Sequence, residues 1–373
     1  MNFKNINIVL RDKIINASLE VKDGKIASID KTANLEGLEM KDYYLVPGFI
    51  DQHVHGAFNH DFMDGTKEAL NGYSMAVLQE GITSFLGTTM TQSISNVEKA
   101  VHNLVGTASG ANLLGVHLEG PFIGKVFNGA QPEEYIIKPD IELFKEINKF
   151  NNIKIVSMAP EEDDNFEFIK YLVKNNIKVS MAHTSATYDQ AQGAILAGAH
   201  GFTHGYNAMS KLHHRDIGVV GMMLLDDNTY AEIIADGIHV SYPAIKLLFK
   251  NKGRDNIILI TDSMRAKHLP DGISELGGQE VIVKNNEARL NDGSLAGSIL
   301  KMNDGVRNLV NNVGISLVDA IYVAATTPAI NIGATNKGFI EEGMDADLVV
   351  LDKEFNVVMT IVNGKIMYER GKN

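Results

Sequence analysis

Short apolar runs recur along the middle of the chain, and each is followed by a segment whose apolar positions have helical spacing. Eight such runs can be distinguished, and their lengths are typical of buried strands. Between them, stretches such as 96–105 and 189–199 place apolar residues on one helical face. Repeated strand-then-helix units are what a parallel barrel requires, so the pattern predicts an α/β protein with a (β/α)₈ TIM barrel. The predicted strands are residues 48–55, 82–88, 112–120, 153–160, 177–184, 201–207, 230–237 and 256–263.

The two ends of the chain have a different pattern, with short alternating strands joined by tight turns. Ile6 and Ile8 share one face of the first strand, and Asp23-Gly24 is a hairpin signal near the N-terminus. Asn363-Gly364 is the matching signal near the C-terminus. We therefore expect a small β-sandwich domain formed from residues 1–46 and 336–373. The barrel would then occupy residues 47–335.

The length and composition agree with this plan and restrict the setting. The 373 residues suffice for a large barrel with a minor domain. No apolar run approaches the roughly 18–20 residues of a membrane helix, and the N-terminus lacks a signal-peptide layout. The chain contains no cysteine, so any metal must be bound by His, Asp and Glu. We expect a cytoplasmic protein without a membrane partner.

The net charge of -12 argues against nucleic acid as a partner, because phosphate backbones recruit basic surfaces. A small anionic substrate remains possible if cations are concentrated locally. The segment 211–215 contains such a cluster, in which the guanidinium of Arg215 is well shaped for phosphate. From the residues alone, a solvated loop is an equally good interpretation.

Chemically capable side chains lie near the C-terminal ends of the predicted strands. In (β/α)₈ enzymes these ends form the active-site face. His53 and His55 are two positions apart and therefore point to the same side of their strand. A charged Glu119 at the end of an apolar strand costs free energy unless a cation is near. The residues concerned are His53, His55, Glu119, His183, His204, Asp236 and Asp262.

Taken singly, each of these residues also has a purely structural interpretation. A lone histidine is more often a core residue than a ligand, and Asp236 or Asp262 could cap a turn. His117, two residues before Glu119, could support the site or belong to the core. Together, four imidazoles and two carboxylates at one rim predict a site for divalent Zn, Fe, Co or Mn. The predicted set is His53, His55, Glu119, His183, His204 and Asp262.

Longer motifs extend this pattern over nearly the whole chain. In these motifs the sequence resembles the amidohydrolase superfamily and, within it, the N-acetylglucosamine-6-phosphate deacetylases. HLEGPF followed by NAM and LAGS is more specific than the HxH pair, which many members of the superfamily share. The motifs include VPGFIDQHVHG (46–56), HLEGPF (117–122), GAQPEEY (129–135), AHTSAT (182–187), THGYNAMS (203–210), TDSMRA (261–266) and LAGSILKM (295–302).

The resemblance implies roles for the residues of the predicted metal site. Glu119, His183 and His204 would be the primary metal ligands, and Asp262 would be the catalytic base. His53 and His55 would hold a second ion in members that keep this pair. The resemblance therefore implies one or two divalent ions in each subunit.

The resemblance also implies a substrate-binding shell and a homodimer. Arg215 and His239 would hold a phosphate, and one or both would reach across from the neighbouring subunit. Gln131 replaces a histidine of some members; its amide could still donate to an acetyl carbonyl, but it cannot be protonated. The residues expected to contact the sugar are Ala130, Gln131, Asn207, Ala208, Leu295, Ala296, Gly297 and Ser298.

The reaction implied by the resemblance is hydrolysis of N-acetyl-D-glucosamine 6-phosphate to D-glucosamine 6-phosphate and acetate, in amino-sugar catabolism or recycling. N-acetylgalactosamine 6-phosphate is an alternative substrate that the sequence leaves open. An amidohydrolase acting on a cyclic amide or an N-acyl amino acid is a second alternative, but it would need no phosphate-binding residues. A catalytically inactive scaffold is disfavoured because all six candidate ligand positions are filled.

Overall fold

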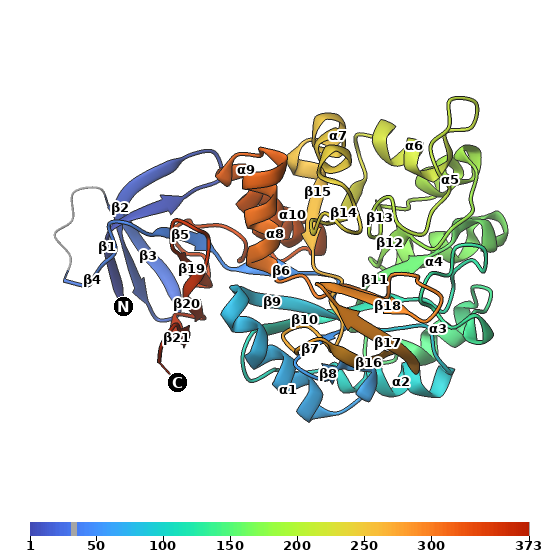
Figure 1. The fold of residues 1–373 in the computed structure, drawn as a ribbon, viewed down its shortest axis with the longest axis horizontal. Coiled ribbons are helices and arrows are strands. Elements are labelled where there is room, and N and C mark those ends of the chain that lie inside the picture. Colours follow the sequence, from blue (N-terminus) through green and yellow to red (C-terminus); the bar gives the residue numbers. More distant parts are fainter. Residues whose placement is uncertain (31–35, 373) are drawn as a thin grey trace.

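All eight predicted strands are present, and they form one parallel sheet in the computed structural model, which describes residues 1–30 and 36–372. Each strand pairs with the next in chain order, which confirms the predicted barrel (Figure 1). The first and last strands approach each other, since Asp262 N–H donates to the His53 carbonyl at 2.9 Å. The strands are β6 (Phe49–Asp51), β9 (Ile82–Thr88), β10 (Asn112–Glu119), β11 (Ile153–Met158), β12 (Lys178–Met181), β13 (Gly201–Phe202), β14 (Tyr230–Ile234) and β15 (Ile257–Ile260).

A helix follows every barrel strand, as the helical spacing predicts. Ser93 and Thr187 accept hydrogen bonds from the first turns of α2 and α5, so these helices begin where a polar cap is available. Two further helices complete the series after α8. The helices are α1 (Lys67–Ala76), α2 (Ile94–Asn103), α3 (Ile141–Ile147), α4 (Glu167–Lys174), α5 (Tyr188–Leu196), α6 (Gly218–Leu225), α7 (Tyr242–Lys252), α8 (Met302–Asn308), α9 (Leu317–Ile321) and α10 (Thr327–Ile332).

Alternate residues of the barrel strands belong to different cores. In β15, Ile257 and Leu259 pack into the main apolar cluster beneath the helices, whereas Ile258 and Ile260 join a small separate cluster. This follows from the two-residue period of a strand, whose side chains point to opposite faces. Because both faces are covered, the strands read as continuous apolar runs in the sequence.

Strands from both ends of the chain lie side by side in a second sheet, at the left of Figure 1, where both termini are found. Its order is β21-β20-β19-β5-β1-β2-β3, with β4 beside β1. Leu45 and Leu348 face the core of this sheet, while their neighbours Val46 and Val349 pack against the barrel. Residues 31–35 and 373 of the predicted terminal ranges lie outside the described residues. The strands are β1 (Asn2–Val9), β2 (Ile14–Lys22), β3 (Lys25–Asp30), β4 (Leu38–Glu39), β5 (Tyr44–Pro47), β19 (Leu348–Leu351), β20 (Val357–Val362) and β21 (Lys365–Glu369).

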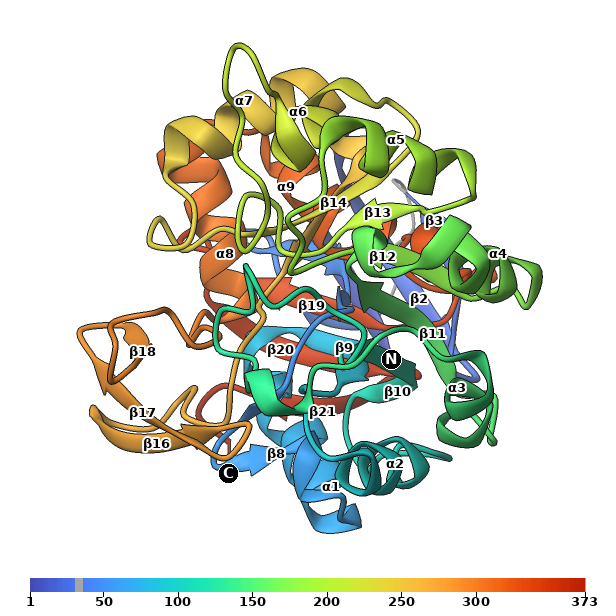
Figure 2. The same ribbon diagram turned by 90° about the vertical axis from the view of Figure 1, so that its right-hand side faces the viewer.

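A third sheet, which the sequence analysis did not predict, is inserted between β15 and α8 and projects beside the barrel (Figure 2). It consists of β16 (Gly272–Leu276), β17 (Gln279–Lys284) and β18 (Glu287–Leu290), all antiparallel. Its turns at Gly277-Gly278 and Asn285-Asn286 have positive φ, a conformation that glycine and asparagine adopt readily. A smaller hairpin, β7 (Gly56–Ala57) with β8 (His60–Asp61), follows β6. Among the described residues, no helix is long and apolar enough to span a membrane.

Candidate metal centre and substrate cavity

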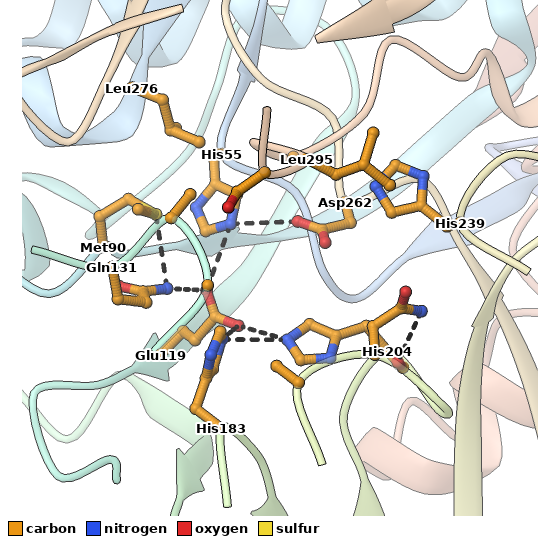
Figure 3. A pocket seen from close by; sticks show the side chains of 16 residues that line it. His55, Met90, Glu119, Gln131, His183, His204, His239, Asp262, Leu276 and Leu295 are labelled. Atoms are coloured by element: carbon orange, nitrogen blue, oxygen red, sulfur yellow. Dashed lines mark hydrogen bonds and ion pairs between the residues drawn. The ribbon is translucent and has the colours of Figure 1, made fainter. Parts of the chain in front are cut away.

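The C-terminal ends of the barrel strands open into a cavity of about 300 Å³ (Figure 3). Most residues predicted from the strand ends and from the family motifs meet in its wall. Met90, Leu276 and Ser294, which the sequence analysis did not single out, line it as well. The remaining lining residues are His55, Glu119, Gly129, Ala130, Gln131, His183, His204, Asn207, Ala208, His239, Asp262, Leu295 and Gly297.

Glu119, His183 and His204 form a compact cluster at the floor of the cavity. The Nδ1–H of His183 donates to the Phe127 carbonyl at 2.9 Å, which leaves a lone pair on its Nε2. That Nε2 lies 3.1 Å from His204 Nε2 and 3.4 Å from Glu119 Oε1, and His204 Nε2 lies 3.2 Å from the same oxygen. Three donor atoms therefore converge on one point. This set fits a divalent ion that takes nitrogen and oxygen ligands.

His53 and His55 bring two more imidazoles to the other side of Glu119. His55 Nε2 lies 3.3 Å from Glu119 Oε2 and 3.2 Å from Asp262 Oδ1. His53 Nε2 lies 3.5 Å from Glu119 Oε1 and from Asp262 Oδ1. The Oε2 atom of Glu119 therefore faces His55, while its Oε1 faces the other three imidazoles. His53, His55 and Glu119 thus form a second group of donor atoms close enough together to hold a metal ion.

Charge and burial shift the pKa values of these groups in opposite directions. Burial alone would raise the pKa of Asp262, but His53 and His55 lower it to about 2. Burial would lower the pKa of His55, but Asp262 and Glu119 raise it to about 9. The neighbouring imidazoles likewise hold the pKa of Glu119 well below its ordinary value despite its burial. The cluster thus stabilises positive charge at its centre, as a metal site must.

Three of these residues have an unusual backbone conformation at the point where their strands end. His183, His204 and Asp262 have φ values of +44°, +35° and +47°, in the left-handed region that disfavours side chains with a Cβ. Surrounding hydrogen bonds hold them there; for example, Ser298 N–H donates to the Asp262 carbonyl at 2.7 Å. Strain of this kind concentrates at functional sites. Here it turns all three side chains toward the cavity.

The residues expected to contact the sugar divide into two groups. Six of them line the cavity wall, among them Asn207 and Ala208. Ala296 and Ser298 lie behind the wall instead: Ala296 packs in an apolar cluster, and the Ser298 hydroxyl donates to the Thr261 carbonyl at 2.5 Å. These two residues therefore support the loop that carries Leu295 and Gly297.

Gln131 is held by hydrogen bonds at both ends of its amide. Its Oε1 accepts from Thr91 N–H at 2.8 Å, and its Nε2 donates to Glu119 Oε2 at 2.9 Å. The same Nε2 lies 3.6 Å from Met90 Sδ. Its donors therefore orient Glu119 in this structure, whereas the sequence suggested an amide free to contact an acetyl carbonyl.

Arg215 does not reach the cavity of its own chain. It lies on an exposed loop, where its Nη1 is 2.6 Å from His214 Nε2. His239, the other residue expected to bind phosphate, does line the cavity and has its Nδ1 2.6 Å from Asp236 Oδ2. Asp236 also accepts from the N–H groups of Ile238 and His239, so it caps the turn and orients His239.

Two further buried groups surround His53. His117 donates from Nδ1 to the Gln52 carbonyl at 3.0 Å, and its Nε2 lies 2.6 Å from the Ser157 hydroxyl. Burial, with the charge of His53, lowers the pKa of His117 to about 4, so it is neutral and packs against His53 without facing the cavity. Glu232, which the sequence analysis missed, lies 2.9 Å from His53 Nδ1. The only sequence signal for Glu232 is a carboxylate inside the apolar run 230–235.

The fold agrees with the comparisons to known proteins. The amidohydrolase family model matches residues 44–367, and the chain belongs to this family, as the motifs predict. The chain is 42% identical to the N-acetylglucosamine-6-phosphate deacetylase of Bacillus subtilis (strain 168), over 98% of this chain and 96% of that protein. It is 34% identical to the N-acetylgalactosamine-6-phosphate deacetylase of Escherichia coli O157:H7, over 93% and 94% of the two chains. The crystal structure of N-acetylglucosamine-6-phosphate deacetylase from Thermotoga maritima has a TM-score of 0.90 at 34% identity, over 99% of this chain and 100% of that one.

Proposed function

We propose that this protein hydrolyses the acetyl amide of N-acetyl-D-glucosamine 6-phosphate, producing D-glucosamine 6-phosphate and acetate in amino-sugar metabolism. The observation that carries the proposal is the placement of Asp262 beside a group of convergent metal ligands in one cavity. Relatives of nearly the same length that carry this activity in their names support the substrate.

The candidate metal ligands and Asp262 each have a role in this proposal. Glu119, His183 and His204 would hold the first divalent ion, and His53 and His55 would hold a second. When bound, a divalent ion lowers the pKa of a coordinated water from about 15.7 toward 7 and polarises a carbonyl oxygen. Asp262, whose low pKa keeps it ionised, accepts a proton from the attacking water and returns it to the departing sugar nitrogen.

The phosphate requires cations that lie away from the reacting amide. His239, oriented by Asp236, would contact the phosphate from the same chain. We propose that Arg215 supplies a cation from the neighbouring subunit of a homodimer, because its exposed loop does not line the cavity of its own chain. A guanidinium binds phosphate through two parallel hydrogen bonds, so Arg215 would fix the far end of the sugar.

N-acetylgalactosamine 6-phosphate is the second candidate substrate. It differs only in the configuration of one ring hydroxyl, and a relative of similar length is named for it. Both sugar phosphates would present the same amide to Asp262 and the same phosphate to His239. Measuring kcat/KM for both, and for unphosphorylated N-acetylglucosamine, decides between them.

Asp262→Asn tests the catalytic assignment. The amide keeps the shape of the side chain but cannot take up the water's proton, so kcat should fall by roughly a hundred- to ten-thousand-fold. Mass spectrometry should show that the first ion is retained, because Glu119, His183 and His204 are unchanged. Turnover near that of the wild type would refute the role of Asp262. An unchanged preference for the phosphorylated sugar in the residual activity would show that the binding residues are intact.

A further inference from the structure

Glu232 is a buried carboxylate in the middle of β14, with 3% of its surface exposed. Within residues 1–30 and 36–372, no lysine or arginine forms an ion pair with it; it contacts the imidazole of His53 instead, at 2.9 Å. A buried charge without a partner is costly. The cost of burying Glu232 is therefore offset by its hydrogen bonds and by its contact with His53.

Hydrogen bonds fix the orientation of this carboxylate. Oε1 accepts from Gln52 Nε2 at 2.6 Å, and the Gln52 Oε1 in turn accepts from Asn331 Nδ2 at 2.9 Å. Oε2 accepts from the backbone N–H of His204 at 3.3 Å and faces His53 Nδ1. These hydrogen bonds hold the Glu232 side chain in place from the side remote from the cavity. It presents one oxygen to His53.

The contact between Glu232 Oε2 and His53 Nδ1 determines which nitrogen of His53 carries a proton. An ionised carboxylate only accepts hydrogen bonds, so the hydrogen must lie on Nδ1 of His53. The Nε2 atom is then free to act as a ligand. In this structure Nε2 is buried, has no hydrogen-bond partner among the described residues, and points between Glu119 and Asp262.

The balance of charge in the site also favours binding of a cation at His53 Nε2. Glu119, Asp262 and Glu232 bring three carboxylates into contact with the imidazoles of the site. One divalent ion supplies two positive charges and two ions supply four. The third carboxylate therefore increases the attraction for a second cation, and it does so through the imidazole that would bind it.

We propose that Glu232 is a positioning residue that holds His53 as a ligand and thereby determines whether the second divalent ion is retained. The inference rests on the proposed metal-dependent function, since it concerns the same site. Carboxylates that orient metal-binding imidazoles typically strengthen metal affinity by about 10- to 100-fold.

The test is Zn²⁺ binding to the full-length, metal-free protein. Calorimetry measures the affinity of each ion, and metal analysis after gel filtration counts the ions that remain bound. The wild type should bind two ions in each subunit. Glu232→Gln keeps an oxygen near His53 but removes the charge, so the second ion should bind about 10- to 100-fold more weakly. The first ion should bind as in the wild type. Glu232→Leu, which also removes the oxygen, should lose the second ion altogether.

Asp163→Asn is the matched control, because Asp163 is a buried carboxylate that accepts only from the N–H groups of Phe168 and Ile169. This variant should retain both ions. His53→Asn, which removes the proposed ligand itself, should weaken binding of the second ion at least as much as Glu232→Gln. Adding Glu232→Gln to His53→Asn should weaken it no further. Thermal unfolding of the metal-free variants checks that each is folded.

The inference is overturned if Glu232→Gln binds the second ion like the wild type, if both ions weaken equally, or if the wild type binds only one. Deacetylation of N-acetylglucosamine 6-phosphate is measured on the same samples. Absence of that activity with the expected zinc pattern would overturn the proposed function and support the role of Glu232. Normal deacetylation together with unchanged binding of the second ion would support the proposed function and overturn the role of Glu232.

Discussion

Individual imidazoles show how the surroundings of a side chain decide its chemistry. His53 and His183 each have Nδ1 engaged by an acceptor, a carboxylate in one case and the Phe127 carbonyl in the other. Their Nε2 atoms are therefore free for a metal. His117 has both ring nitrogens engaged and packs behind the site. The three side chains are chemically identical, and their hydrogen-bond partners show which nitrogen atoms are free to bind a metal.

His200, before β13, is a histidine whose surroundings oppose its charge. Burial and the nearby Lys178 lower its pKa to about 4. The folded protein therefore binds fewer protons at this residue than the unfolded chain, whose histidines titrate near 6.5. This contribution to stability is fully present above pH 6.5 and is lost as the pH falls toward 4.

We predict that His200→Gln reduces the acid sensitivity of the metal-free protein. The full shift corresponds to about 3 kcal/mol, and the partial exposure of the ring reduces the expected effect to about 1–2 kcal/mol. Urea unfolding at pH 7 and pH 4.5 measures this difference in the free energy of unfolding. The metal is removed so that metal release does not contribute. The same loss of stability in the variant and the wild type would contradict the pKa assigned to His200.

The barrel strands were predictable as elements because each is an uninterrupted apolar run followed by a helical pattern. The inserted sheet of β16, β17 and β18 was not predicted, because it lies outside this repeat and exposes much of its surface. Its alternating residues and its turns at Gly277-Gly278 and Asn285-Asn286 were nevertheless visible signals. This sheet contributes to the site, since Leu276 at the end of β16 forms part of the cavity wall.

The loop after β18 is the element that ties this sheet to Asp262. Gly297 has a φ of +59°, and a Cβ there would lie 3.1 Å from the Asp262 carbonyl oxygen. Gly297→Ala should therefore cost about 1 kcal/mol of stability and displace Asp262. We expect a loss of roughly tenfold in kcat, which corresponds to about 1.4 kcal/mol, with metal content unchanged.

Gly293→Ala is the control for this prediction. Gly293 lies on the same loop with a φ of +91°, but a Cβ there would meet nothing within 4 Å. It should lower the melting temperature by a few degrees while leaving kcat near the wild-type value. Equal losses of kcat in both variants would show that the effect comes from strain in the loop and not from displacement of Asp262.

At the scale of the whole molecule, barrel closure brings distant parts of the chain together. His53 and Asp262 lie in the first and last strand-end segments, yet His53 Nε2 is 3.5 Å from Asp262 Oδ1. Arg215 lies on an exposed loop and, unlike His239, does not line the cavity of its own chain. A site completed by a second copy of the chain makes a specific prediction about mixed dimers.

We predict that two inactive variants, Arg215→Ala and Asp262→Asn, restore activity when mixed and allowed to exchange subunits. In a hybrid dimer, the subunit with an intact Asp262 would receive Arg215 from its partner. With random exchange, half of the dimers are hybrids with one complete site each, so activity should recover to about a quarter of the wild-type value. No recovery, in samples shown to have exchanged, would place Arg215 in its own subunit or outside the site.

The sequence by itself determined the repeating architecture and the chemical groups at the strand ends. It did so because apolar periodicity reports burial, and burial with a two-residue or a helical period specifies the element and its faces. Only the tertiary structure decided which side chains meet across the barrel. The pairing of Glu232 with His53 depends on strands far apart in the chain. The bonding of Gln131 to Glu119 and the position of Ser298 behind the wall depend on how loops fold over the strand ends. Local pattern carries no information about such a partner, because a strand's period gives the direction of a side chain but not what lies opposite it.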